Sequence, residues 1–280
     1  MQTSRKLAVK ASSSEQGFSL IEMMIAVILI SAVMAVAVNG MMQMQQRNSA
    51  EASKTDAVQE TRDFIDQVVR DIHDAGYPPA RAINVAVSLG TGVVPLCTNP
   101  TATINTVVRT SSSIACGIVA YNQRAVTYEG DLGDGNNVSV VTLDIVPASG
   151  TTCPCTVRRG VITKAQWVAS GCSTNPAGSG CIPQYFTEVN GILNSGNGAG
   201  GSWGVTLSGP GTYTAYTTAD VFDAYDVSGN SVAPCSLTTT PDCTSIRSLQ
   251  ITANVTSSYA DPAVKNYPVF SITSKARLNF

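Results

Sequence analysis

The chain has 280 residues, a net charge of −2 and only 13% charged residues. This length allows a long helix and one sizeable globular domain with its own core. Residues 1–17 carry Arg5, Lys6 and Lys10 against Glu15, so the remainder has 14 basic and 18 acidic residues, a charge of −4. That balance gives no general electrostatic basis for binding nucleic acid.

The first predicted element is an apolar helix that follows the basic leader, residues 1–17. No charged residue occurs from Met23 to Gln46, and only Ser31 interrupts the apolar run from Met23 to Val38. Because about 20 such residues can cross a bilayer as a helix, this run predicts a membrane span. Glu22 is a lone carboxylate at its start, and burial of one acidic group in a bilayer costs about 2.5–3.5 kcal/mol.

Three interpretations of this segment are open on these grounds. It can be a secretory signal that is cleaved after Ala35-Val36-Ala37, in which case the rest would be a secreted binding protein or enzyme. It can be a plain single-pass anchor. It can also be a leader that is cut on the cytoplasmic side between Gly17 and Phe18, which would leave the apolar helix on the mature protein.

The segment Gly17-Phe18-Ser19-Leu20-Ile21-Glu22 closely resembles the type IV prepilin signature. The resemblance implies cleavage after Gly17, N-methylation of Phe18 and a role for Glu22 in subunit assembly. The other two interpretations leave the carboxylate of Glu22 in the apolar segment unexplained. The implied partners are the prepilin peptidase, other major and minor pilins, and an inner-membrane assembly platform. No cofactor is implied. The implied location is the inner membrane, with the C-terminal domain periplasmic, and then the pilus at the cell surface.

The predicted helix continues past the apolar run as an amphipathic helix, within a segment that we assign to residues 18–76. Gly40 is its one weak point. An apolar stripe at alternating three- and four-residue spacing predicts the buried face, and an opposite face carries alternating charges at i,i+4. The stripe consists of Val58, Thr61, Ile65, Val68, Ile72 and Ala75, flanked by Phe64; the charges are Arg62, Asp66, Arg70 and Asp74. Gly76, followed by Tyr77-Pro78-Pro79, predicts the end of the helix.

Residues 77–280 have the alternation of strands and predict one antiparallel β domain packed on the helix, an α+β, pilin-like fold. We expect strands at 124–128, 138–146, 249–255 and 270–280, a turn at 129–137 and a mobile loop at 195–211. Further segments are similar to PilW-type minor pilins and favour a type IV pilus component; a related J-type pseudopilin of type II secretion remains the alternative. These segments are 62–77, 126–135, 221–230 and Arg277-Leu278-Asn279-Phe280.

Eight cysteines lie beyond the apolar run and predict disulfides in an oxidising compartment. We expect one bond between Cys235 and Cys243, which bracket a proline-rich turn, and a stabilisation of about 2–3 kcal/mol from it. Cys172 and Cys181 are a weaker candidate pair. For Cys153 and Cys155, separated by Pro154, we expect each to pair with a different, distant cysteine. Zinc is disfavoured because no C-x-x-C pair is present.

No catalytic constellation is visible, and we expect a non-enzymatic structural protein. The only histidine, His73, lies on the amphipathic helix and is expected to be solvated. The segment Asp131–Asn137 has oxygen ligands suited to calcium, but its spacing also fits a plain hairpin turn and departs from an EF-hand. Trp167 and Trp203 could form a sugar-binding surface, although we expect packing roles for both.

Overall fold

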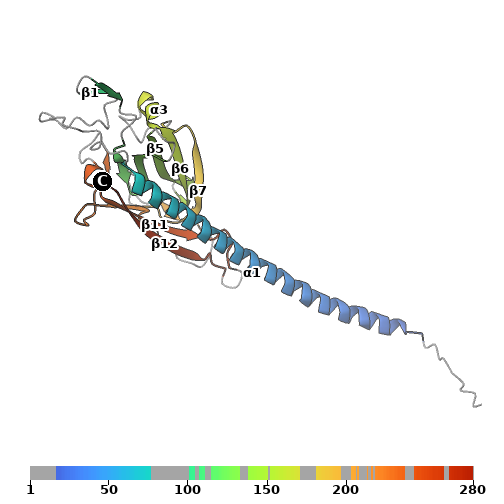
Figure 1. Ribbon diagram of the computed structural model, residues 1–280. Helices are drawn as coiled ribbons and strands as arrows, with labels where there is room; N and C mark the ends of the chain where they lie inside the picture. The colour runs from blue at the N-terminus through green and yellow to red at the C-terminus, as the bar shows by residue number, and fades with distance from the viewer. Residues whose placement is uncertain are drawn as a thin grey trace, which may run out of the picture. The chain divides into compact units, whose positions relative to one another are not determined.

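The computed structural model describes residues 17–76, 101–104, 107–110, 115–132, 138–150, 152–170, 181–196, 203–205, 207, 213, 216, 218–236, 243–261 and 265–279. The chain divides into two units, residues 1–47 and 48–280. The first unit contains the apolar part of one long helix, and the second contains the rest of that helix and the β domain (Figure 1). Each unit is considered by itself.

The described elements, in chain order, are α1 (Leu20–Asp74), β1 (Thr101–Ile104), β2 (Val107–Thr110), β3 (Gly117–Asn122), β4 (Ala125–Gly130), β5 (Ser139–Ser149), β6 (Thr152–Thr163), α3 (Lys164–Ala169), β7 (Tyr185–Ile192), β8 (Gly204–Val205), β9 (Phe222–Tyr225), β10 (Cys235–Ser236), the 3-10 turn η3 (Cys243–Ser245), β11 (Ser248–Thr256) and β12 (Val269–Arg277).

Helix α1 is continuous through Gly40 and ends two residues before Gly76. Gly76 has a φ of 85°, which L side chains rarely adopt, and its N–H donates to the carbonyl oxygen of Glu129 over 2.8 Å. The hydrogen bond turns the chain away from the helix axis and ties the helix end to β4. The glycine stop that the sequence predicts therefore has a partner in the sheet.

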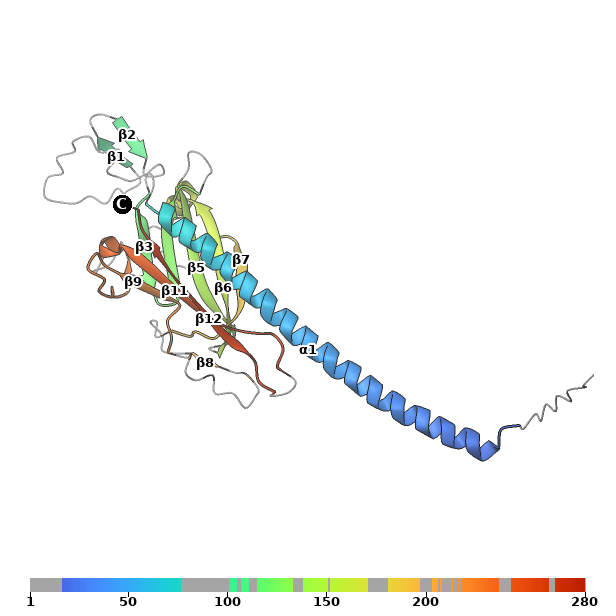
Figure 2. The same ribbon diagram turned by 60° about the horizontal axis from the view of Figure 1, so that its bottom comes forward.

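The predicted apolar stripe on the second part of α1 is confirmed. Thr61, Phe64, Ile65, Val68, Ile72 and Ala75 are all buried, whereas Val58 is half-buried. Figures 1 and 2 both show this part of α1 running along one face of the sheet. The predicted charged residues Arg62, Asp66, Arg70 and Asp74 are exposed, so this part of the helix has one buried face and one solvent-exposed face.

The β domain contains a ten-stranded sheet, and the α+β architecture predicted from the sequence is confirmed. The main path has the order β10-β3-β4-β5-β6-β7-β11-β12, while β8 pairs with β6 and β9 pairs with β11. Strands β3 to β7 form an antiparallel meander, and β11 and β12 form a long antiparallel pair over nine register positions. The pairing of β6 with β8 is parallel. Strands β1 and β2 form a separate hairpin.

The predicted strands correspond to β4, β5, β11 and β12, with bounds that differ by a few residues. Part of the predicted turn (residues 133–137) and most of the loop predicted at 195–211 lie outside the described residues. In β11, the predicted apolar face of Leu249, Ile251, Ala253 and Val255 is buried, whereas the predicted polar face is exposed less than expected, because Ser248 and Asn254 are buried as well.

The meander meets the β11–β12 pair at one tight point next to Gly191. Only Val255 of β11 and Ile192 of β7 are in register there. Gly191 has a φ of 79°, and a Cβ at this position would lie 2.7 Å from the carbonyl oxygen of Thr256. Because both the backbone conformation and the space exclude a side chain, glycine is required for the two parts of the sheet to join.

A large apolar core lies between α1 and the sheet, with contributions from the whole second unit. It extends from Phe64 and Ile72 of the helix to Ala276 and Leu278 at the end of the chain. A smaller cluster lies around Trp167 of α3, with Val119 and Val140 from the sheet. Beside it, the ammonium of Lys164 lies 2.6 Å from a carboxylate oxygen of Glu129, and both side chains are fully buried.

One polar cluster in this core holds α1 against the sheet. A single carboxylate oxygen of Asp71 accepts hydrogen bonds from the Tyr128 hydroxyl (2.9 Å) and from the Arg159 guanidinium (2.8 Å). The Asp71 and Arg159 side chains are only 14% and 15% exposed, and Tyr128 is fully buried. Burial, together with the negative charge of Asp71, raises the pKa of Tyr128 well above its usual value, so its hydroxyl stays a proton donor. The cluster fixes the rotation of the helix about its axis.

Replacement of Asp71 by alanine is expected to lower the free energy of unfolding of the β domain by about 3 kcal/mol, because it leaves a buried hydroxyl and a nearly buried guanidinium without their acceptor. The measurement is urea unfolding of the purified chain in detergent, followed by the fluorescence of Trp167 and Trp203. Asp66→Ala removes an exposed carboxylate from the same helix and is the matched control, with an expected change within about 0.5 kcal/mol. Equal losses in the two variants would contradict the locking role of Asp71.

Candidate processing and assembly site

The bond between Gly17 and Phe18 lies just outside the first turn of α1. Residues 17–19 are not helical, and the helix begins at Leu20. Phe18 is 77% exposed, and a Cβ built on Gly17 would have nothing within 4 Å. A non-helical, exposed peptide bond is what a protease needs, because a helical bond does not fit an extended substrate channel. The predicted cleavage position therefore has an accessible backbone.

Glu22 lies in the first turn of α1, one turn beyond Phe18. The N–H groups of Glu22 and Met23 donate to the carbonyl oxygen of Ser19, over 3.0 and 3.1 Å. Ser19 and Glu22 are thus at the N-cap and N3 positions, with the residue types of a capping box. An acidic side chain there also interacts favourably with the helix dipole.

The capping-box spacing of Ser19 and Glu22 was not part of the sequence prediction. Its signal is the spacing Ser-x-x-Glu directly before an apolar run, which is present in the chain. Glu22 therefore has two possible uses, one within its own helix and one between subunits. The two uses depend on different properties of the side chain, since a cap needs a hydrogen-bonding oxygen and an ion pair needs a charge.

The part of α1 that follows Glu22 exposes apolar side chains on all sides. The large residues among them are each at least 45% exposed: Met23, Met24, Ile25, Val27, Ile28, Leu29, Ile30, Val33, Met34, Val36, Val38, Met41, Met42 and Met44. By length and composition the helix can cross a membrane. Ser31, the one polar residue of the central run, donates its hydroxyl to the carbonyl oxygen of Ile28 over 2.8 Å, which removes an unpaired donor from the apolar surface.

Gly17, Phe18 and Glu22 are thus brought together at the start of α1, whereas Cys235 and Cys243 belong to the other unit. Cys235 starts β10 and Cys243 starts η3, and the two are joined by a disulfide with Cα atoms 5.2 Å apart. The bond links β10 to η3, and both cysteines belong to the main core. No described cysteine is free; Cys97 and Cys172 lie outside the described residues.

The expectation that Cys153 and Cys155 pair with distant cysteines is wrong in the structure. The two are bonded to each other, with Cα atoms 4.3 Å apart and a cis peptide bond between Cys153 and Pro154. Residues two apart in a strand have side chains on the same face, and here both sulfur atoms face the core. The shared face, which follows from the strand itself, brings the two sulfur atoms together.

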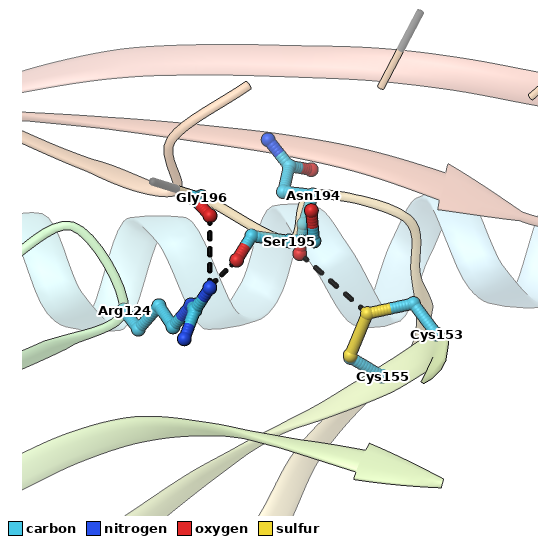
Figure 3. The surroundings of a disulfide bond; sticks show 6 residues. All are labelled: Arg124, Cys153, Cys155, Asn194, Ser195 and Gly196. Atoms are coloured by element: carbon cyan, nitrogen blue, oxygen red, sulfur yellow. Dashed lines mark hydrogen bonds between the residues drawn. A yellow bond between two sulfur atoms is a disulfide. The ribbon is translucent and has the colours of Figure 1, made fainter. Parts of the chain in front are cut away.

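Arg124 organises the segment next to this disulfide (Figure 3). Its guanidinium donates to the carbonyl oxygens of Ser195 (2.6 Å) and Gly196 (2.9 Å), and it lies 4.0 Å from the ring centroid of Trp203. The Cys153 sulfur lies 3.8 Å from the carbonyl oxygen of Asn194. A disulfide sulfur carries no proton, so that approach is a contact and not a hydrogen bond. The contacts around Arg124 and the Cys153–Cys155 disulfide are therefore those of a structural packing site.

The other candidate residues have ordinary environments. Trp167 is buried in the smaller core cluster and Trp203 is half-buried beneath Arg124, so neither presents an open aromatic face. His73 is exposed, and its ring lies 3.5 Å from the Asp74 carboxylate. Most of the candidate calcium segment 131–137 lies outside the described residues, and no group of three possible metal ligands occurs within them.

Residues 12–38 match the prokaryotic N-terminal methylation motif. Comparisons with curated proteins and with solved structures gave no match to this chain. The matched segment includes Gly17, Phe18, Glu22 and the apolar part of α1, and it identifies the N-terminal segment as type IV prepilin-like. A prepilin-type motif implies processing by a prepilin peptidase and incorporation with other pilins. The apolar helix also suits anchoring in a membrane before assembly.

Peptide mapping without reduction is expected to find Cys235 linked to Cys243, and Cys153 linked to Cys155 within one peptide. Replacement of Cys235 and Cys243 together by serine should lower the free energy of unfolding by about 2.5 kcal/mol, because the reduced chain regains the freedom of the open loop. Reduction followed by repeat mapping is the control for both assignments. A bond from any of these four cysteines to another residue would contradict the corresponding pair.

Proposed function

We propose that the chain is a non-enzymatic minor pilin of PilW type, which is cleaved between Gly17 and Phe18 and is incorporated into a type IV pilus through α1. The observation that carries this proposal is the combination of the methylation motif with a helix whose apolar first part is exposed on all sides. A secretory signal would be discarded with that part of the helix, and a plain anchor would need Glu22 only at its helix start, without a partner in another subunit.

The geometry of α1 supports incorporation into a filament. The part up to Met44 has apolar side chains all round, so lipid covers it before assembly and neighbouring helices cover it afterwards. The part from Thr61 onwards is covered by its own β domain on one face. The similarity of the segments 62–77, 126–135, 221–230 and 277–280 to PilW-type proteins supports the assignment to that class.

The distribution of charges and cysteines supports a specific orientation. Three basic residues against one acidic residue in the leader favour a cytoplasmic N-terminus. The disulfides all lie in the second unit and need an oxidising compartment, which is the periplasm for a domain anchored in the inner membrane. The partners in this proposal are the prepilin peptidase, other major and minor pilins, and the inner-membrane assembly platform.

Glu22 supports a position below at least one other subunit. Cleavage would give Phe18 a positive amine among apolar helices, and an isolated charge there is costly while a pair at contact offsets much of the cost. Glu22 lies in the first turn of α1, four residues after Phe18 in the chain. In an axially staggered filament, its carboxylate can meet the amine of the next subunit above. A subunit at the extreme tip has no such neighbour.

The mature protein is expected to start at an N-methylated Phe18. The measurement is mass spectrometry of the N-terminal peptide from the protein purified from its own membranes. Gly17→Ala is the control for processing, since the uncleaved form should accumulate with its leader attached. A mature protein that starts at Val38 would refute the proposal and favour a secreted binding protein or enzyme.

Substitution of Glu22 by glutamine is expected to reduce incorporation into sheared filaments by about tenfold or more, which corresponds to about 1.4 kcal/mol lost per subunit. Glutamine keeps the capping oxygen but removes the charge, so it separates the ion pair from the local cap. Glu22→Ala removes both and should be impaired at least as strongly. Cleavage at Gly17 and membrane insertion should be unchanged in both variants.

Wild-type incorporation of the glutamine variant, with loss only in the alanine variant, would assign Glu22 to helix capping instead. If neither variant affects filaments but both impair protein secretion, the pseudopilin alternative would replace the type IV pilus in this proposal.

A further inference from the structure

A charged hollow lies where β9, β11 and the end of β12 meet, at residues that have no role in the proposed assembly. The three strands lie next to one another in Figure 2, in agreement with their register. The hollow has a volume of about 380 Å³. Its lining includes three basic residues, one acidic residue, one hydroxyl and one apolar side chain: Arg247, Lys275, Arg277, Asp226, Ser248 and Val227.

The lone carboxylate of the hollow is engaged by its own turn. One oxygen of Asp226 accepts hydrogen bonds from the N–H groups of Ser228 and Asn230, both 2.8 Å, and the other accepts from the Asn230 amide at 3.1 Å. The backbone hydrogen bond from Asn230 is the main reason why the pKa of Asp226 is lowered. Asp226 therefore shapes the rim of the hollow, and its carboxylate oxygens are held by its own turn.

The basic side chains of the hollow are attached to backbone that the sheet holds in place. The N–H of Arg247 donates to the Tyr225 carbonyl oxygen (2.8 Å), and the Arg247 carbonyl oxygen accepts from the N–H of Leu278 (3.0 Å), so both neighbouring strands hold its backbone. The Lys275 ammonium lies 4.1 Å from the ring centroid of Tyr225. Lys275 and Arg277 are two residues apart on β12, so they share one face of the sheet.

The charge of this hollow differs from that of the rest of the protein. Three cations and one carboxylate give a local charge of +2, whereas the chain from Phe18 onward has −4. Among the described residues, no ion pair includes Lys275 or Arg277, and both side chains are exposed. Their N–H groups are available to acceptors in solution. Arginine and lysine side chains that converge in this way favour carboxylate and phosphate oxygens.

We propose that this hollow binds an oxyanion group, a carboxylate or phosphate, presented by a small molecule or by the end of a larger ligand. A volume of about 380 Å³ suits one compact group and lies at the lower end of the usual size of ligand pockets. The exposed Val227 on the rim gives apolar contact to whatever carries the group. The proposal is independent of the assignment as a pilin, because it depends only on the β domain.

The test is isothermal titration calorimetry of the full oxidised chain in detergent with inorganic phosphate and, separately, with acetate. The variant Lys275→Gln/Arg277→Gln should weaken binding of the preferred ion by about tenfold or more, since it removes two charged hydrogen-bond donors. The matched control Arg62→Gln/Arg70→Gln removes the same charge from the exposed face of α1 and should bind like the wild type. Thermal unfolding verifies that each variant is folded.

A third variant changes binding in the opposite direction. Asp226→Asn keeps an acceptor oxygen for the N–H groups of the turn but removes the negative charge, so it should tighten oxyanion binding. Preference for phosphate or for acetate decides which oxyanion the ligand carries. Absence of binding to the wild type, or equal weakening in the α1 control, would overturn the proposal; binding that none of the hollow variants changes would mean an adventitious ion only.

Discussion

The first part of α1 has an apolar surface that no other described residue of its unit covers. The need to cover this surface is the main constraint on where the protein can exist. From Met23 to Met44 every large apolar side chain is exposed, and only Ser31, Asn39 and Gln43 are polar. Each buried methylene group is worth about 0.8 kcal/mol on transfer out of water, so a surface of this size is unstable in solution. Lipid or other helices must therefore cover it. The motif at residues 12–38 indicates that both do so in turn.

The second part of α1 meets the opposite requirement, because its own chain must cover it on one face only. Burial of the apolar stripe stabilises the packing of the helix on the sheet. Because a hydrophobic stripe alone tolerates small rotations of the helix about its axis, the hydrogen bonds of Asp71 are needed to fix that rotation. Gly76 then ends the helix against β4 through its hydrogen bond to Glu129. The side chain of Glu129 lies next to Lys164 in the interior. A continuous series of contacts thus joins the helix end, the meander and α3.

The parts of the fold that are visible in the sequence are those with local causes. The stripe from Thr61 to Ala75, the stop at Gly76 and the apolar face of β11 depend on spacing within one element, and each is found in the structure. Asp71 could not be assigned in the same way: its partner Arg159 is 88 residues away, and the exposed Arg70 and Asp74 nearby on the helix are charged as well. A polar residue beside an apolar stripe gives no indication of what lies across the core.

The same distinction applies to the sites. Gly17, Phe18 and Glu22 form a contiguous motif, so their proximity follows from the chain itself. The short strands β8 and β10 have two residues each and no periodicity to detect. The hollow beside β12 draws its cations from residues 247, 275 and 277, which meet only because β11 and β12 are paired. Clusters of this kind depend on register, and register is set by the assembled sheet.

The position of β12 has a consequence for export. This strand ends at Arg277, pairs with β11 over its whole length, and together with Leu278 supplies side chains to the core that also buries Ile72. In a chain that enters the membrane by its N-terminal helix and crosses in order, the helix segment around Ile72 would emerge early and β12 last. The shared core would then be completed only when β12 and Leu278 have crossed, so the loss of these C-terminal residues would leave the core incomplete.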